Sequence, residues 1–309
     1  MSAAVKAPQF KMSFFAPRYW PVWLGATLLY LLTWLPFPLI RLLGRGVGYL
    51  LKTLAKQRVW VARRNIELWD PSLSSQQVDK LLNDNIARTG MALFETAMGW
   101  WWPNWRVKRH FEVEGYEYVE EAFKAKGGVF GMALHNVNLE FACRGLGYTH
   151  PSIAFYRKHD NPLIDYLQYH GRNRSNKYMI HKRNSKALIR ALEDNEMCLY
   201  LPDQDYGPRQ SIFVPFGGVS ETATTTGTLM FIRRTQCVPL MVTSQYTASG
   251  YKVKFYPPMP ELRDMDDETA LTLLNQKIDT IVKEQPDSYL WMHKRFKTRP
   301  ESSPQSLYK

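Results

Sequence analysis

The sequence predicts an α/β fold in which a mixed sheet is flanked by helices and preceded by an N-terminal membrane helix. Three observations support this prediction. Short apolar runs of strand length follow residue 127, amphipathic stretches of helical length lie between them, and an uncharged apolar segment lies near the N-terminus. The 309 residues, 45% of them hydrophobic, are enough to bury one large core, which we place at residues 59–300.

The uncharged segment covers residues 19–40, YWPVWLGATLLYLLTWLPFPLI. Its length approaches the ~20 apolar residues that cross a bilayer, and tryptophans near both ends are typical of the membrane interface. We therefore expect a single-pass membrane helix over 19–38, preceded by an N-terminal segment over 1–18. Because Pro36 and Pro38 should stop a helix near Leu35, the span would be rather short, and a buried hairpin is the alternative. The sequence does not separate a true span from insertion into the interface.

The next segment, residues 39–58, places leucines among basic side chains. This pattern is typical of an amphipathic helix that lies in the membrane interface on anionic headgroups. More basic residues follow the apolar segment than precede it, so the positive-inside rule places residues 59–300 in the cytoplasm. We expect residues 301–309 to form a flexible tail.

Beyond the N-terminal region, Ser74 and Gln77 form a capping box at the start of a helix that should run to about Thr96. Strands and helices then alternate. We expect strands at 129–134, 152–156, 177–180, 197–201, 238–246 and 251–256, and helices at 137–147, 161–171, 185–194, 222–235 and 267–284.

The formal net charge of +12 indicates an acidic partner: nucleic acid, anionic lipid or a phosphorylated substrate. Ten tryptophans and seventeen tyrosines favour lipid, because such rings prefer the membrane interface. No nucleic-acid-binding module is recognisable, so we expect no nucleic acid. The cysteines, Cys143, Cys198 and Cys237, are odd in number and lack a CxxC pair, which argues against disulfides and a zinc site and fits a reducing compartment.

His135 is the main candidate for catalysis. It follows an apolar strand, and Glu140 lies in the helix that begins just after it. Ligand sites of open α/β sheets lie at the carboxyl ends of strands. With His135 ahead of the helix and Glu140 in its first turns, the carboxylate can fix the imidazole tautomer and leave the other nitrogen as a general base. A histidine with an acid five residues away is also common without function.

A protein nucleophile is not evident. The sequence has no G-x-S-x-G elbow, and no cysteine neighbours a suitable histidine. This favours direct attack by a substrate hydroxyl on an activated acyl donor.

A basic cluster lies on the turns around the next two expected strand–helix units. Its members are Arg157, Arg172, Arg174, Lys177, Lys182 and Arg183. Arginine matches the geometry of phosphate and carboxylate, although a solvated basic face is the alternative interpretation. Asp203 and Asp205 in PDQDYG could bind a metal or a substrate donor, or simply cap a turn. The stretch HKRFKTRP (293–300) adds cations suited to lipid headgroups or an acidic carrier.

Several blocks together resemble the lipid A biosynthesis late acyltransferase family, within the glycerolphosphate-acyltransferase-like superfamily. They are PRYWPVWLG, ETAMGWWWP (95–103), HNVNLE, the segment 156–177, PDQDYG, TATTTGT (222–228) and RFKTRP (295–300). The resemblance covers nearly the whole chain and is closest to the lauroyl- and palmitoleoyl-transferring branch. It implies an acyltransferase-like fold and a location at the bacterial inner membrane.

The resemblance also implies a reaction: acyl transfer from acyl carrier protein to a hydroxyl on a primary acyl chain of a Kdo-bearing lipid A precursor, without metal or cofactor. His135 and Glu140 match the superfamily's His-x4-Asp/Glu motif. The family's supporting arginine and aspartate fall on Arg172 and Asp203, with Arg157 and Arg174 as further substrate-binding candidates. HNVNLE is more polar between its ends than is usual in such motifs.

Two alternatives remain at this stage: an acyltransferase that uses glycerol phosphate acceptors, and a non-catalytic lipid-binding membrane protein. The sequence does not determine the acyl-chain length, the primary acyl chain that accepts the acyl group, or the oligomeric state.

Overall fold

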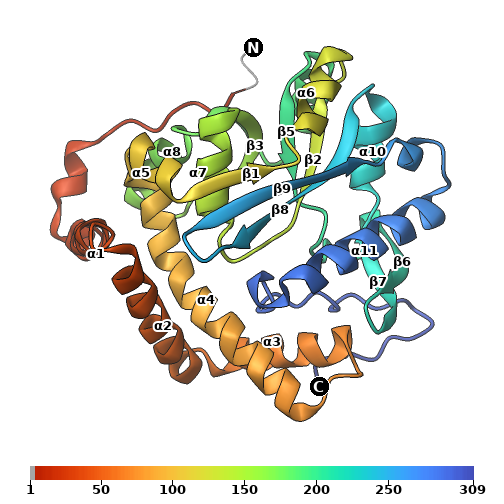
Figure 1. Cartoon of the computed structure of the whole chain (residues 1–309), viewed down its shortest axis with the longest axis horizontal. Coiled ribbons are helices and arrows are strands. Elements are labelled where there is room, and N and C mark those ends of the chain that lie inside the picture. Colours follow the sequence, from red (N-terminus) through yellow and green to blue (C-terminus); the bar gives the residue numbers. More distant parts are fainter. Residues whose placement is uncertain (1–3) are drawn as a thin grey trace.

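The computed structural model describes residues 4–309 and contains a seven-stranded mixed sheet at its centre (Figure 1). The strand order is β1-β9-β8-β2-β5-β3-β4. All neighbours are parallel except β8 and β9, which pair antiparallel. The strands are β1 (Phe111–Glu114), β2 (Val129–Ala133), β3 (Ser152–Tyr156), β4 (Asn176–His181), β5 (Met197–Tyr200), β8 (Val238–Tyr246) and β9 (Tyr251–Pro258). The predicted mixed sheet and its six predicted strands are confirmed.

Two layers of helices cover the sheet. Successive side chains of β2 point to opposite faces, as a strand requires. Phe130 and Met132 join the core beneath α9, α10 and α11, whereas Val129 and Ala133 pack with α6 and α7. The bounds are α5 (Asn104–Arg109), α6 (Glu117–Lys124), α7 (Leu139–Thr149), α8 (Pro162–Arg172), α9 (Ser185–Glu193), α10 (Gly227–Arg234) and α11 (Asp267–Glu284).

One predicted helix begins too early. Residues 219–225 form strand β7 (Val219–Thr225), which pairs with β6 (Ser211–Phe216) in a separate hairpin that packs on α11. The run of threonines explains the difference, because β-branched side chains favour a strand over a helix. The helix itself, α10, starts only at Gly227.

The N-terminal third contains four helices: α1 (Trp20–Leu32), α2 (Phe37–Leu54), α3 (Lys56–Trp69) and α4 (Ser75–Trp101). The prediction of one membrane helix over 19–38 is wrong. Helix α1 ends at Leu32 and α2 begins after Pro36, because proline disfavours helical backbone at the residue before it. Within residues 4–309, no helix has both the length and the apolar character to cross a membrane.

Helix α2 lies against α4, as Figure 1 shows, and glycines allow the two backbones to approach. A Cβ on Gly90 would lie 2.2 Å from the Gly44 oxygen and 2.2 Å from the Gly48 nitrogen. The face of α2 that points away from α4 carries exposed leucines instead, among them Leu42, Leu50 and Leu54. The capping box of α4 is formed as predicted, and the helix continues to Trp101, past the expected end.

Both ends of the described chain contact the main body. The Val5 amide donates to the Met179 carbonyl at 2.7 Å, so the N-terminal segment covers the edge strand β4. Single 3₁₀ turns at Met12–Phe15 and Pro17–Tyr19 connect this segment to α1. Near the other end, the Tyr308 hydroxyl accepts from the Phe296 amide at 3.0 Å and donates to Asn65. The expected flexible tail therefore packs against α3.

Candidate active site

The turn after β2 places His135 at the carboxyl end of the central strand. Asn136 holds this turn from one side, because its amide donates to Thr243 Oγ1 at 2.9 Å and to the Ser244 carbonyl at 2.7 Å. The chain segment after α11 holds it from the other side. The Val137 amide donates to the Ser288 carbonyl at 2.8 Å, and the His135 carbonyl accepts from the Leu290 amide at 2.9 Å. The turn that carries His135 is thus bound to two distant parts of the chain.

The imidazole of His135 is paired with Asp203. Its Nδ1 lies 2.6 Å from Asp203 Oδ1, and the His135 backbone amide donates to Oδ2 at 2.9 Å. Only 1% of the Asp203 side chain is exposed. Burial would raise the pKa of this carboxyl, but the charge of His135 and its hydrogen bonds outweigh burial, so the pKa is lowered. An ionised carboxylate at Nδ1 fixes the tautomer whose Nε2 can accept a proton.

Glu140 does not make the contact that we expected from its spacing to His135. Its two carboxylate oxygens accept from Arg172, Nε at 2.9 Å and Nη2 at 2.7 Å, and Oε1 also accepts from Trp100 Nε1 at 2.7 Å. In the described residues no hydrogen bond joins it to His135. The predicted imidazole partner is therefore corrected from Glu140 to Asp203.

The reason is the strand order. Asp203 follows β5, and β5 pairs with β2 in parallel, so the carboxyl ends of both strands meet at the same edge of the sheet. Glu140 lies in the first turn of α7 and contacts α4 and α8 instead. An acid directly after an apolar strand was a visible signal in the sequence. The adjacency of β2 and β5 was not visible.

A cavity of about 980 Å³ opens beside these groups. His135, Glu140, Arg157 and Arg172 line it, so four predicted site residues meet there. Lys182 and Arg183 add positive charge to the lining. Apolar side chains that sequence reasoning did not single out form another part of the wall: Phe155, Leu199, Met230 and Phe231.

Arg174, by contrast, is not part of the cavity lining. Its guanidinium donates to the carbonyls of Trp100 and Trp102, at 2.6 and 2.9 Å, where α4 ends. A cation at the carboxyl end of a helix satisfies carbonyls that lack helical partners. The structure therefore gives Arg174 a contact with the protein itself.

Two further residues of the cavity wall were missed. Burial raises the pKa of the Cys143 thiol to about 12, so this cysteine stays protonated near neutral pH. Burial, together with the charge of Arg174, lowers the pKa of Arg144 to about 10, and its Nε has no hydrogen-bond partner in the described part of the chain. Both follow Glu140 on α7, where only the three-dimensional packing reveals them.

Asp205, the second acid of PDQDYG, ties this loop to the segment 293–300. Its carboxylate accepts from the Thr298 amide at 2.6 Å and from the Thr298 hydroxyl at 2.8 Å. A second cavity of about 710 Å³ lies here, lined by Arg58, Lys294 and Lys297. Tyr206 lines both cavities. Across residues 4–309, no three His, Cys, Asp or Glu side chains are grouped to hold a metal ion.

Comparison with known proteins identifies the class. A family model described as bacterial lipid A biosynthesis acyltransferase matches residues 7–298. The protein is therefore an acyltransferase enzyme, in keeping with its α/β fold and its histidine-lined cavity.

Several named relatives are similar along nearly the full length of the chain. The lipid A biosynthesis lauroyltransferase of Escherichia coli K12 is 40% identical over 301 residues, which cover 96% of this chain and 98% of the relative. The palmitoleoyltransferase of the same organism is 39% identical over 305 residues, covering 97% and 99%. A lipid A biosynthesis acyltransferase of Haemophilus influenzae is 38% identical, covering 98% of each chain. The chain belongs to the bacterial lipid A biosynthesis acyltransferase family.

Proposed function

We propose that the protein transfers a fatty acyl chain from acyl carrier protein to a hydroxyl on a primary acyl chain of a Kdo-bearing lipid A precursor, with His135 as general base. One observation carries this proposal: the His135–Asp203 pair, at 2.6 Å, stands at the wall of a cavity large enough for an acyl chain. Since Nδ1 is bound to the carboxylate, Nε2 is the nitrogen available to a substrate.

In the proposed reaction, His135 Nε2 removes the proton of the acceptor hydroxyl as its oxygen attacks the carbonyl carbon of the thioester. The C–O bond forms and the carbonyl becomes an oxyanion. The carbonyl double bond then re-forms as the C–S bond breaks, and the leaving carrier thiolate takes the proton from the imidazolium. Asp203 stabilises that imidazolium without accepting its proton. No acyl-enzyme forms, which fits the protonated state of Cys143.

Glu140 and Arg172 act as a unit in this proposal. The bidentate pairing holds the Arg172 guanidinium at the cavity wall. It uses Nε and Nη2, so Nη1 takes no part in the two hydrogen bonds to Glu140. We assign to Arg172 the binding of an anionic group of the substrate or of the developing oxyanion. Glu140 then acts through Arg172 as a positioning residue.

The other residues that line the active-site cavity include a basic group and an apolar group. The side with Arg157, Lys182 and Arg183 suits phosphates or sugar carboxylates of the acceptor and the acidic surface of a carrier protein. The apolar side with Phe155, Met230 and Phe231 suits the acyl chain. The named relatives transfer lauroyl and palmitoleoyl groups, so a chain in this range is the natural first donor to test.

We further propose that α1 and α2 lie on the cytoplasmic face of the bacterial inner membrane. Both helices expose large apolar side chains, among them Leu24, Leu28 and Leu42. An amphipathic or apolar helix that lies in the interface buries such side chains in lipid. The cavity would then receive the acceptor from the membrane and the carrier from the cytoplasm.

The test is His135→Ala in cells that lack the native protein, read by mass spectra of lipid A. We expect the secondary acyl chain to be missing. A normal acylation pattern with this variant would rule out the proposed base. Purified protein assayed with a panel of acyl carriers, with Kdo-bearing precursor against glycerol phosphate acceptors, separates this function from phospholipid synthesis.

A further inference from the structure

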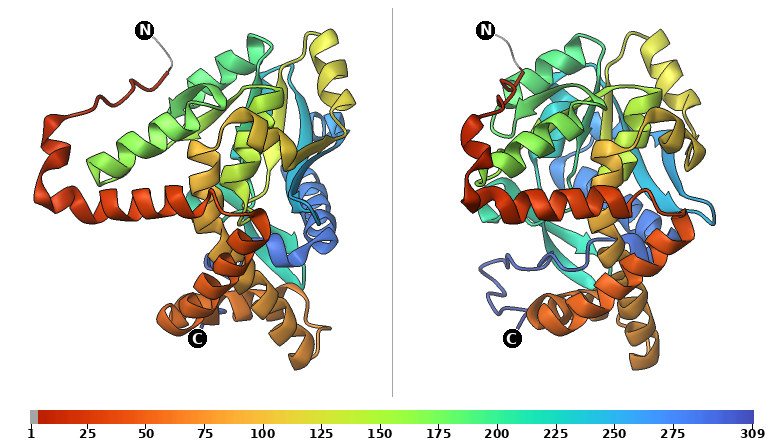
Figure 2. Two further views of the ribbon diagram at one scale, coloured as in Figure 1. Left: turned by 60° about the vertical axis from the view of Figure 1, so that its left-hand side comes forward. Right: turned by 90° about the vertical axis from the view of Figure 1, so that its left-hand side faces the viewer.

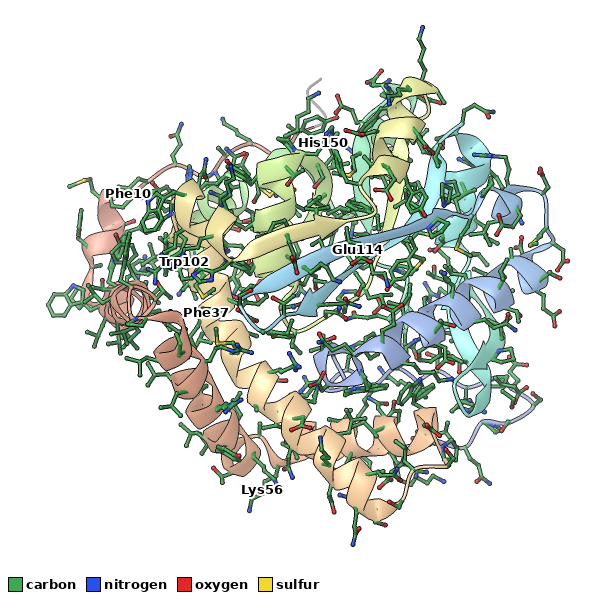
Figure 3. All side chains as sticks on the ribbon, viewed as in Figure 1. Phe10, Phe37, Lys56, Trp102, Glu114 and His150 are labelled. Atoms are coloured by element: carbon green, nitrogen blue, oxygen red, sulfur yellow. The ribbon has the colours of Figure 1, made fainter. Side chains whose placement is uncertain are left out.

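A third cavity lies at the elbow between α1 and α2, away from the His135 site. Its volume is about 470 Å³. The residues that line it are Trp34, Pro36, Phe37, Pro38, Trp105, Arg106, Arg109 and His110. In Figure 3, Phe37 is labelled at the start of α2 and Trp102 lies above it. Figure 2 shows α1 projecting from this side of the molecule. The known family activity gives this cavity no role.

Two arginines give the cavity its charge. Arg106 is only 8% exposed and is held between the rings of Trp34 and Trp102, 5.1 and 4.1 Å from their centroids. Nη2 donates to the Leu35 carbonyl at 2.8 Å, and in residues 4–309 its other N–H groups have no hydrogen-bond partner. Arg109 is exposed and forms neither an ion pair nor a hydrogen bond within the same residues.

No acid balances this charge locally. The chain has no Asp or Glu before Glu67, and α5, which carries both arginines, has none either. The first turn of α2 also lines the cavity, and the amino end of its helix dipole adds positive potential there. The unused N–H groups of Arg106 are open to solvent, and with no acid nearby they can donate to an incoming anion.

The surroundings identify the kind of anion. Trp105 is 61% exposed and Trp34 is 43% exposed at the rim of the cavity, and Leu31 and Leu39 lie exposed on either side of the elbow. Tryptophans beside arginines are typical of the level of lipid headgroups, where rings contact the glycerol region and cations contact phosphates. A free phosphate would leave these apolar side chains in water, whereas the acyl tails of a phospholipid would cover them.

We propose that the elbow cavity binds the headgroup phosphate of an anionic phospholipid, with Arg106 and Arg109 as its ligands. This inference rests on the proposed contact of α1 and α2 with the membrane and does not depend on acyl transfer. A bound lipid would hold the α1–α2 elbow at a fixed depth in the interface and so fix the height of the catalytic cavity above it.

The test uses the full chain, with phosphatidylglycerol and phosphatidylcholine as probes. Native mass spectrometry in detergent counts retained lipids, and flotation measures binding to phosphatidylcholine vesicles with and without phosphatidylglycerol. We expect one retained phosphatidylglycerol in preference to phosphatidylcholine, and Arg109→Gln should weaken its retention about fivefold, the effect of one basic residue at a membrane surface. Arg109→Lys should recover part of the binding.

Arg45→Gln is the matched control, because Arg45 is exposed on α2 but does not line the cavity. An equal loss with Arg45→Gln would show diffuse attraction and overturn the site, as would equal retention of the two lipids by the wild type. Displacement of phosphatidylglycerol by a phosphorylated lipid A precursor, but not by inorganic phosphate, would assign the cavity to the acceptor and also overturn the proposal. His135→Ala should bind phosphatidylglycerol like the wild type, so failure of the catalytic proposal remains distinguishable.

Discussion

The His135 site and helix α1 differ in how their side chains are partnered. Around His135, the side chains of Asp203, Asn136 and Glu140 each have hydrogen-bond partners inside the protein. Around α1 the reverse holds: none of its residues is buried, and large apolar side chains face outward. The catalytic side chains of the first region are held by contacts within the protein, whereas the second region exposes an apolar surface, for which we propose lipid as the partner.

The sharpest way to break this comparison is at Asp203. Asp203→Asn keeps the shape but presents an amide to Nδ1, which favours the wrong imidazole tautomer. We expect the rate of acyl transfer to fall by about 10⁴-fold, the scale known for such pairs in serine proteases. Purified variants are compared by turnover with the same donor and acceptor.

Asp205→Asn serves as the matched control, because it alters the neighbouring acid, whose partner is Thr298. A loss of similar size in both variants would mean that the loop, and not the imidazole contact, is what the enzyme requires.

A second prediction concerns Glu95, on the helix that both regions share. Its carboxyl is buried and accepts from the hydroxyls of Tyr251 and Tyr246, at 2.9 and 3.2 Å. Burial raises its pKa to about 8, although the two hydrogen bonds oppose the rise. Because the folded pKa lies above the unfolded one, folding binds a proton, so this group's contribution to stability declines as the pH rises from about 4.5 to about 8, by at most about 1.4 kcal/mol per pH unit.

Glu95→Gln should remove this slope, because the amide oxygen still accepts hydrogen bonds but does not titrate. Urea unfolding at a series of pH values, read by tryptophan fluorescence, measures the effect. An unchanged slope in the variant would show that Glu95 is ionised in the folded protein at neutral pH.

A third prediction compares two glycines at the junction of the regions. Gly90→Ala would place a Cβ against the backbone of α2, so we expect a loss of about 1–3 kcal/mol from overpacking. Gly46 lies on α2 with nothing within 4 Å of an added Cβ. Gly46→Ala should therefore stabilise the helix by about 0.5–1 kcal/mol. Thermal unfolding of both variants provides the measurement, and equal shifts would contradict the close helix contact.

The smallest effect on stability is expected at Leu28, which is 53% exposed on α1. Leu28→Ser should change the free energy of unfolding by no more than about 0.5 kcal/mol, because the side chain has little protein contact to lose. The binding of the Leu28→Ser variant to lipid vesicles should nevertheless weaken. A large loss of stability with unchanged vesicle binding would show that α1 packs against protein in solution.

Much of the fold was predictable from local pattern. The six strands, the capping box of α4 and helices α7, α8, α9 and α11 follow from periodicity and end signals that lie within a few residues of each other. The short strand β1 and the β6–β7 hairpin were missed, because four to seven residues that are stabilised by distant partners leave little local signal. The break between α1 and α2 was signalled by Pro36 and Pro38, and a full membrane helix was nevertheless expected.

By itself, the sequence indicated that His135 stands at the end of a strand and that the protein carries an excess of positive charge, whereas the supporting roles of Arg172 and Asp203 were implied by the family resemblance. Only the tertiary structure decided which side chains touch. Parallel pairing of β2 with β5 brings Asp203 to the imidazole of His135, 68 residues away in the sequence. The packing of α8 on α4 and α7 brings Arg172 into hydrogen-bonding contact with Glu140. The physical reason is that hydrogen bonds form across distances in space of about 3 Å, which depend on strand order and helix packing and are not encoded in the spacing along the chain.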